Sequence, residues 1–360
     1  MQLVTFERSD ESSAIAGLGD VAAVSSQGRL ANAALGFDTL EFSRPGVRWL
    51  GALLPPGPHA GDVVDLNRAL AVKLASEDVG APEAEADSLL PSDMLGFLRR
   101  GRASLAVAEN ALAWALDALL RYDAPDLLGA GVVLPRRSAR LCAPVPRPGK
   151  ILCVARNYLA HAAERGSPER PEEPVLFLKP ASAVIGPDDD VLIPRVSEQV
   201  DYEGELAAVI GSTARNVVAD EALEHVAGYT AANDVSARDF QNVRGQQMLG
   251  KCCDTFAPTG PALVTRDEIP DPQDLSIRTT VSGEPRQDAR TKEMVFSVAE
   301  LVAFASRLMT LEPGDLLLTG TPAGVGAAAS PPRWLRDGDV VDVEIEHIGR
   351  LRNHVRDDRS

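Results

Sequence analysis

Apolar residues recur at helical spacing in the first part of the chain. Leucine and alanine side chains three or four positions apart over residues 102–122 predict a helix, with Leu116 and Leu120 among its apolar positions. Upstream, residues 63–66 predict a strand that leads into another helix. The acidic, alanine-rich segment 81–87 between them is expected to form a mobile loop. This mixture favours a small α/β domain.

The pattern then changes to strands. Short apolar runs bounded by turn residues predict buried strands at residues 150–154, 175–178 and 205–210. Near the end of the chain, apolar and acidic residues alternate over 341–346, which predicts a strand with one solvated face. One helix has a clear start, because Ser297 and Glu300 form a capping box ahead of an apolar face. We therefore expect a strand-rich second part with few helices.

Three prolines separate the two patterns. The segment 143–149 cannot continue a helix or a central strand, so it is expected to be an extended connector. The chain has 360 residues, and single hydrophobic cores rarely grow beyond ~250–300 residues. We predict two domains in an α+β, mostly β protein: a smaller α/β domain over residues 1–145 and a larger domain over residues 146–360.

Charge and composition exclude several classes of partner. The chain carries 36 lysines and arginines against 52 aspartates and glutamates, a net charge of −16, which argues against nucleic acid and anionic membranes. Glycines and prolines interrupt the longest uncharged stretch, 316–332, so no spanning helix is expected there. The first residues contain no apolar stretch of signal-peptide length, and the four cysteines lack C-x-x-C spacing. These features predict a cytoplasmic, reducing location.

An acidic stripe precedes the predicted strand 205–210. On a strand, residues two apart share a face, so we expect Asp201, Glu203 and Glu205 to point the same way. Carboxylates so close together need cations or raised pKa values. A divalent ion such as Mg²⁺ or Mn²⁺ would meet this need, because both prefer oxygen ligands. A solvated acidic face is the alternative that this segment alone leaves open.

A second acidic residue lies close to a pair of candidate substrate ligands. Asp234 adjoins an apolar run, and Arg238 and Gln241 follow it three positions apart. On a helix those two side chains would meet on one face and could clamp a substrate carboxylate. The alternative is that Asp234 caps a helix and Arg238 is a surface charge.

A histidine and a glutamate form a candidate general base. His161 and Glu164 stand at positions i and i+3, where on a helix the carboxylate can orient the imidazole and stabilise its charged form. Such a pair is more often exposed on a helix surface. Here it directly follows a buried strand, and the polar segment 165–170 after it could act as a lid.

Six segments in order resemble the fumarylacetoacetate hydrolase (FAH) family. The order and spacing hold from about Pro148 to Val355, and residues 1–145 are similar to the smaller N-terminal domain of many bacterial members. The resemblance implies a rolled, mixed β-sandwich in the larger domain, usually dimeric, that binds Mg²⁺ or Mn²⁺, with Ca²⁺ possible. The six segments are 147–158, 174–180, 201–206, 233–239, 250–256 and 318–326.

The resemblance also implies roles for individual residues. Asp201 has no consistent metal role in the family and is expected to support the site from outside. Ala155, Gln247 and Cys252 replace a frequent glycine, aromatic residue and serine, so the pocket wall is expected to differ. The implied metal ligands are Glu203, Glu205 and Asp234; the catalytic residues are His161, Glu164 and Lys251; the substrate-binding residues are Arg238, Gln241, Lys179 and Thr321.

The family's substrates are 2-oxo or 1,3-dicarbonyl acids, such as the acylpyruvates and fumarylacetoacetate of aromatic catabolism. Our hypothesis is hydrolysis of a carbon–carbon bond: Glu164 orients His161, which deprotonates a water, and the metal and Lys251 stabilise the departing carbanion as an enolate. The alternative is a decarboxylase or isomerase, of the oxaloacetate decarboxylase or 2-hydroxyhepta-2,4-diene-1,7-dioate isomerase type. An alternative of another class is a non-catalytic, metal-stabilised binding protein.

Overall fold

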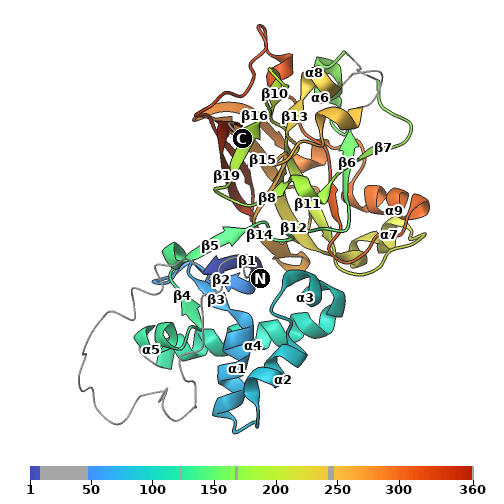
Figure 1. Cartoon of the computed structure of the whole chain (residues 1–360). Coiled ribbons are helices and arrows are strands. Elements are labelled where there is room, and N and C mark those ends of the chain that lie inside the picture. Colours follow the sequence, from blue (N-terminus) through green and yellow to red (C-terminus); the bar gives the residue numbers. More distant parts are fainter. Residues whose placement is uncertain (9–47, 122–123, 167–168, 242–246, 359–360) are drawn as a thin grey trace. The chain divides into compact units, whose positions relative to one another are not determined.

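The computed structural model describes residues 1–8, 48–121, 124–166, 169–241 and 247–358. Contacts between residues divide the chain into two compact units, Met1–Cys142 and Ala143–Ser360 (Figure 1). Their boundary falls at the first residue of the proline-containing segment 143–149.

The N-terminal unit combines a small antiparallel sheet with helices that gather on one side of it (Figure 1). The strand order is β4-β3-β2-β1, and β5 pairs with the other edge of β1. The strands are β1 (Gln2–Arg8), β2 (Trp49–Leu53), β3 (Val63–Asp65), β4 (Val133–Leu134) and β5 (Ala139–Cys142). The helices are α1 (Leu66–Ser76), α2 (Pro82–Leu89), α3 (Met94–Arg100), α4 (Arg102–Arg121) and α5 (Ala124–Gly129).

Two sequence predictions in this unit are confirmed and one is wrong. The strand at 63–66 leads directly into α1, where the Asp65 side chain caps the helix by accepting the Arg68 N–H. The helix over 102–122 is α4. The segment 81–87, expected to be a loop, lies in α2 instead. Pro82 begins that helix, and Glu83 and Glu85 stand in its first turn, where negative charge stabilises a helix.

The buried face of α4 differs from the one predicted. Its buried residues are small, Ser104 and four alanines, whereas Leu120 is 88% exposed. Alanine side chains allow other elements to approach the helix closely, so the small residues of α4 are buried instead of its leucines. Among the described residues, α4 is also long and apolar enough to cross a membrane by length and composition alone. A single helix of this kind is weak evidence for a membrane span, because core helices of soluble proteins pass the same test.

The C-terminal unit contains two main sheets. The first has the order β14-β12-β11-β17-β6-β7, with β8 paired to β14, and the second has the order β16-β15-β18-β19-β9. The first comprises β6 (Ile151–Ala155), β7 (Val175–Lys179), β8 (Val184–Ile185), β11 (Gly204–Ile210), β12 (Val226–Asn233), β14 (Ala257–Thr265) and β17 (Leu316–Leu318). The second comprises β9 (Asp190–Ile193), β15 (Ser276–Val281), β16 (Glu284–Arg290), β18 (Val340–Ile345) and β19 (Gly349–Asp357).

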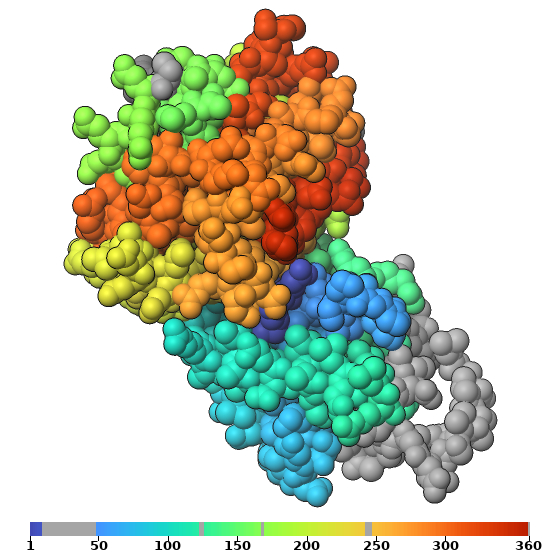
Figure 2. Space-filling model, turned by 180° about the vertical axis from the view of Figure 1, so that it is seen from behind, coloured from blue at the N-terminus to red at the C-terminus, as the bar shows by residue number. Residues whose placement is uncertain are grey.

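Every strand predicted in this unit is present, as β6, β7, β11 and β18. The predicted capping box of Ser297 and Glu300 starts α9 (Val298–Leu308). Helices α9 and α7 (Ala219–Ala222) contact each other and lie side by side in both views of the molecule (Figures 1 and 2).

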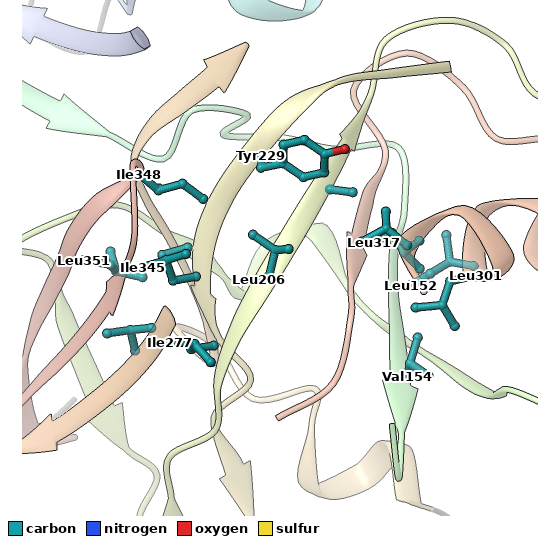
Figure 3. Packing of buried hydrophobic residues seen from close by; sticks show 14 of the residues in the cluster. Leu152, Val154, Leu206, Tyr229, Ile277, Leu301, Leu317, Ile345, Ile348 and Leu351 are labelled. Atoms are coloured by element: carbon teal, nitrogen blue, oxygen red, sulfur yellow. The ribbon is translucent and has the colours of Figure 1, made fainter. Parts of the chain in front are cut away.

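One face of the first sheet forms the core of the unit. Ile277, Ile345 and Leu351 of the second sheet and Leu301 of α9 belong to the same buried cluster as Leu206 of β11 (Figure 3). Since side chains alternate along a strand, the neighbours of Leu206 point to the opposite face. That opposite face carries the candidate site.

Candidate active site and metal centre

Three carboxylates converge where β11 and β12 meet. Glu203 precedes β11, Glu205 is its second residue, and Asp234 directly follows β12. Gly204 at the start of β11 pairs with Asn233 at the end of β12. The three acidic residues beside this pair therefore lie at the same end of the two strands. Their potential ligand atoms lie within 4.8 Å of one another, and all three residues are buried. The structure therefore brings together the three predicted ligands, which could hold a metal ion.

Two buried lysines partly neutralise this cluster. Lys251 Nζ lies 2.7 Å from Glu203 Oε2 and 2.6 Å from Asp234 Oδ2. Lys179 Nζ lies 2.5 Å from Asp234 Oδ1 and donates to the Val235 carbonyl at 3.0 Å. Arg238 also pairs with Glu203 but is shared with Asp201, so four buried carboxylates face three cations and one negative charge remains uncompensated.

Among the three carboxylates, Glu205 is the one that no lysine or arginine side chain contacts in the described residues. The Gly320 N–H donates to its Oε2 at 2.7 Å, but burial and the charges of Asp234 and Glu203 raise the pKa of Glu205 well above its usual value. The neighbouring Glu203 behaves oppositely: burial would raise its pKa, yet Lys251 and Arg238 lower it below the usual value. A buried all-oxygen cluster with uncompensated negative charge suits a hard divalent cation. The residues present therefore fit the ion that the family resemblance implies.

Asp201 does not join the carboxylate cluster. The chain leaves the strand geometry at Tyr202 and Glu203, between β10 (Val200–Asp201) and β11, so the predicted shared face is interrupted. Asp201 Oδ2 instead lies 2.8 Å from Arg238 Nη2, and its carboxylate accepts the Gly326 and Ala327 N–H groups. The prediction of a common acidic stripe was therefore wrong for Asp201, which supports the cluster through Arg238.

Arg238 and Gln241 meet on the short helix α8 (Arg238–Gln241). Arg238 Nη1 donates to Gln241 Oε1 at 2.9 Å, and Arg238 Nη2 lies 2.7 Å from Glu203 Oε1. The i, i+3 spacing therefore produces the expected contact. Arg238 also links two acidic residues, since it pairs with Asp201 as well as Glu203.

His161 and Glu164 lie on α6 (Leu159–Glu164), which follows β6. His161 Nδ1 lies 2.8 Å from Glu164 Oε1, and the Gly324 N–H donates to Glu164 Oε2 at 2.9 Å. Unlike most histidine–glutamate pairs on helices, this one is largely enclosed, with His161 only 8% exposed. Because Nδ1 faces the carboxylate, Nε2 is the ring nitrogen available to a reactant. The predicted lid segment 165–170 contains residues 167 and 168, which lie outside the described residues.

A cavity of about 340 Å³ connects these groups, within the range of ~300–1,000 Å³ common for small-molecule sites. Its lining includes Ala155 and Gln247, two of the family departures. Lys179, predicted to bind substrate, is buried and pairs with Asp234, and neither of these residues nor Glu164 lines the cavity. The predicted residues that do line it are His161, Glu203, Glu205, Arg238, Gln241, Lys251 and Thr321.

Gln287 of β16 is a buried polar residue that sequence reasoning missed. Its Nε2 donates to Thr321 Oγ1 at 2.7 Å, its Oε1 accepts the Gly204 N–H at 3.0 Å, and Thr321 Oγ1 donates to the Gly204 carbonyl. This network holds Thr321 against the strand between Glu203 and Glu205. No pattern in the sequence distinguishes Gln287 from the solvated residues around it, because only the second sheet brings β16 to the site.

Gly204 is required by the packing of the two sheets. A Cβ atom there would lie 2.1 Å from Thr279 Oγ1 and 3.3 Å from Gln287 Oε1. We expect Gly204→Ala to cost about 1–3 kcal/mol of unfolding free energy, because overpacking forces neighbours to move. It should also weaken Mg²⁺ binding by displacing Glu203 and Glu205. Urea unfolding and Mg²⁺ titration measure both effects. Gly80→Ala, which has open space around its Cβ, is the matched control; equal stability of the two variants would contradict the prediction.

A family profile described as "Fumarylacetoacetate (FAA) hydrolase C-terminal" matches residues 150–356, more than half of the chain. The chain belongs to the fumarylacetoacetate hydrolase family. Solved FAH structures confirm the strand-rich fold class predicted from the sequence. One is "Fumarylacetoacetate hydrolase (EaFAH)" from Exiguobacterium antarcticum, 34% identical, with a TM-score of 0.64 over 87% of this chain and 97% of the other.

Other FAH relatives carry names from a different reaction class. "Oxaloacetate tautomerase FAHD2A, mitochondrial" of Bos taurus is 46% identical over 308 residues, which cover 83% of this chain and 88% of the relative. The structure of a 2-hydroxyhepta-2,4-diene-1,7-dioate isomerase from Mycobacterium marinum is 43% identical, with a TM-score of 0.56 over 64% of this chain and 82% of that chain. These names favour the isomerase alternative over the hydrolase hypothesis.

Proposed function

We propose that this protein catalyses keto–enol tautomerisation of a 2-oxo dicarboxylic acid of the oxaloacetate type. The observation that carries the proposal is one cavity lined both by Glu203 and Glu205 of the buried carboxylate cluster and by His161 of the enclosed histidine–glutamate pair. The similarity to a named oxaloacetate tautomerase over 83% of the chain supports this choice of reaction.

We propose Glu203, Glu205 and Asp234 as ligands of Mg²⁺ or Mn²⁺, with Ca²⁺ as a weaker candidate. A divalent ion bound there would polarise the oxygen atoms of the 2-oxo acid and favour the enolate form. The positive charges of Lys251 and Arg238 face the same carboxylates, so they would hold the ligand set in place and add to the positive potential near the substrate.

His161 is proposed to move the proton. Tautomerisation removes a proton from C3 of the acid and places one on the 2-oxo oxygen, or the reverse. His161 lines the cavity, and its Nε2, the ring nitrogen that Glu164 does not engage, would accept the C3 proton while Glu164 holds the ring and stabilises its positive charge. The Gly324 N–H in turn fixes the Glu164 carboxylate. Arg238 and Gln241 would hold the C1 carboxylate beside this base.

Hydrolysis of a carbon–carbon bond is the second candidate. It is supported by the solved fumarylacetoacetate hydrolase that resembles 87% of the chain, and by the same histidine–glutamate pair, which could activate a water. Tautomerisation requires fewer catalytic elements than hydrolysis. It needs one base and a stabilised enolate, but neither a bound water nor a leaving group.

The decisive experiment follows enol-oxaloacetate by its ultraviolet absorbance in the presence of Mg²⁺. We expect the protein to accelerate ketonisation, and His161→Ala to lower kcat by about 10²–10⁴-fold, the usual contribution of a positioned base. His225→Ala is the matched control, because His225 contacts Ser212 and does not line the cavity. Conversion of acetylpyruvate into pyruvate and acetate, without acceleration on oxaloacetate, would support the hydrolase instead. Release of carbon dioxide would identify a decarboxylase.

Three further expectations concern the whole protein. We propose that residues 1–145 form an accessory domain, that residues 146–360 form the catalytic domain, and that the protein is a homodimer. The bovine relative is named as mitochondrial, whereas we propose a cytoplasmic location for this chain. Light scattering coupled to size-exclusion chromatography measures the oligomeric state.

A further inference from the structure

Two arginines line the cavity without belonging to the machinery described above. Arg156 follows the end of β6, and Arg165 is the residue that caps the C-terminus of α6. Both therefore flank the helix that carries His161 and Glu164. Arg156 also has a φ of 58°, a conformation that non-glycine residues rarely adopt and that is common at functional sites.

Neither guanidinium is committed to an acidic partner. Within the part of the chain that the structure describes, no ion pair or hydrogen bond involves the side chain of Arg156 or Arg165. Arg238 differs, because it pairs with both Asp201 and Glu203. The cavity lining thus combines side chains held in ion pairs with two guanidinium groups that form no ion pair with any described residue.

Arg165 lies near charges of both signs. Burial and the positive charge of Arg238 lower its pKa, whereas the carboxylates of Glu203, Asp201 and Glu164 raise it without forming an ion pair with it. Arg156 and Arg165 are both exposed residues of the cavity lining, so their guanidinium groups are accessible to a bound carboxylate. The chain as a whole carries a charge of −16, which repels dianions, so local positive charge is needed to bind one.

We infer that Arg165 and Arg156 bind the second carboxylate of a dicarboxylic substrate and make the enzyme select dicarboxylic over monocarboxylic 2-oxo acids. The inference rests on the proposed function for the placement of the 2-oxo end of the substrate at the carboxylate cluster. Guanidinium groups suit this role because their planar donors match a carboxylate in two parallel hydrogen bonds. Gln241 and Gln247, the amide side chains of the lining, offer no charge.

The first test measures binding and needs no turnover. N-oxalylglycine and N-propyloxamate share an oxamate head, but only the former has a second carboxylate. With Mg²⁺ present, titration calorimetry should show N-oxalylglycine binding the wild-type protein about tenfold or more tightly than N-propyloxamate. The preference should shrink toward equality in R165M, and further in the double variant R156M/R165M. Arg170→Met is the matched control: Arg170 is an exposed arginine stacked on Phe296, and it does not line the cavity.

The second test uses oxaloacetate and its 4-ethyl ester, which lacks the second charge. R165M should raise the KM for oxaloacetate about tenfold and leave kcat/KM for the ester within about twofold of wild type. An equal loss on both substrates would indicate a structural role and overturn the inference, as would an unchanged binding preference in the double variant. If the protein tautomerises neither substrate but keeps the binding preference, the proposed function fails and the inference stands.

Discussion

Glu205→Gln should abolish most Mg²⁺ binding while leaving the metal-free protein at least as stable as the wild type. Glu205 is 1% exposed and lies beside Asp234 and Glu203 within a cluster that carries excess negative charge. Glutamine keeps the shape of the side chain and can still accept the Gly320 N–H, so it removes repulsion without opening a cavity. It also removes one of three anionic ligands. Loss of a residue that only orients a ligand costs 10–100-fold in affinity, so we expect at least ~100-fold here.

The activity of Glu205→Gln should fall about 10³-fold at a fixed Mg²⁺ concentration, because a bound cation contributes several kcal/mol to stabilising negative charge. Isothermal titration with Mg²⁺ or Mn²⁺ measures the affinity, and urea unfolding in EDTA measures the stability. Glu344→Gln is the matched control, since Glu344 is an exposed residue of β18. Unchanged affinity in Glu205→Gln would remove Glu205 from the ligand set and undermine the metal site.

Lys251→Met should make the protein depend on a divalent cation for its stability. Lys251 is fully buried and pairs with Glu203 and Asp234, so its loss removes one of the two cations that each of these buried carboxylates contacts. Breaking a buried ion pair by removing one partner typically costs 3–5 kcal/mol, and we expect a loss of about this size in EDTA. Methionine fills a similar volume, so the effect reports charge rather than a cavity.

Added Mg²⁺ should restore part of the lost stability, since the cation replaces the missing positive charge. Urea unfolding of Lys251→Met with EDTA and with Mg²⁺ measures the difference. Lys73→Met serves as the control, because Lys73 forms a surface pair with Glu77, and such pairs contribute about 0–1 kcal/mol. A metal-free stability within about 1 kcal/mol of the wild type would contradict the prediction.

Local patterns predicted the elements of the C-terminal unit well because those signals are carried by neighbouring residues. The alternation at 341–346 and the capping box of Ser297 and Glu300 each depend on residues a few positions apart. The segment 81–87 was expected to be a loop although Pro82 and the acidic first turn of α2 are local helix signals. The buried face of α4 was decided by distant residues instead, since packing within the unit buries alanines rather than Leu120.

In the candidate site too, contacts within one helical turn were predicted correctly and two contacts between distant residues were not. The spacing of His161 with Glu164 and of Arg238 with Gln241 predicted contacts that the structure contains, because one helical turn brings such residues together. The grouping of Asp201 with Glu203 and Glu205 was wrong, since a break in the strand turns Asp201 toward Arg238. Lys179 was expected at the substrate but pairs with Asp234 and does not line the cavity.

By itself, the sequence determined the residue types of the site, two of the strands beside them, β6 and β11, and, through six ordered segments, the family. Only the tertiary structure decided that Gln287 supports Thr321, that Gly204 has no room for a side chain, and that Arg156 and Arg165 line the same cavity without partners among the described residues. The physical reason is the distance along the chain between the residues that interact. Strand and helix signals arise between neighbours in the chain, whereas burial, charge balance and cavity shape arise between residues that the fold brings together.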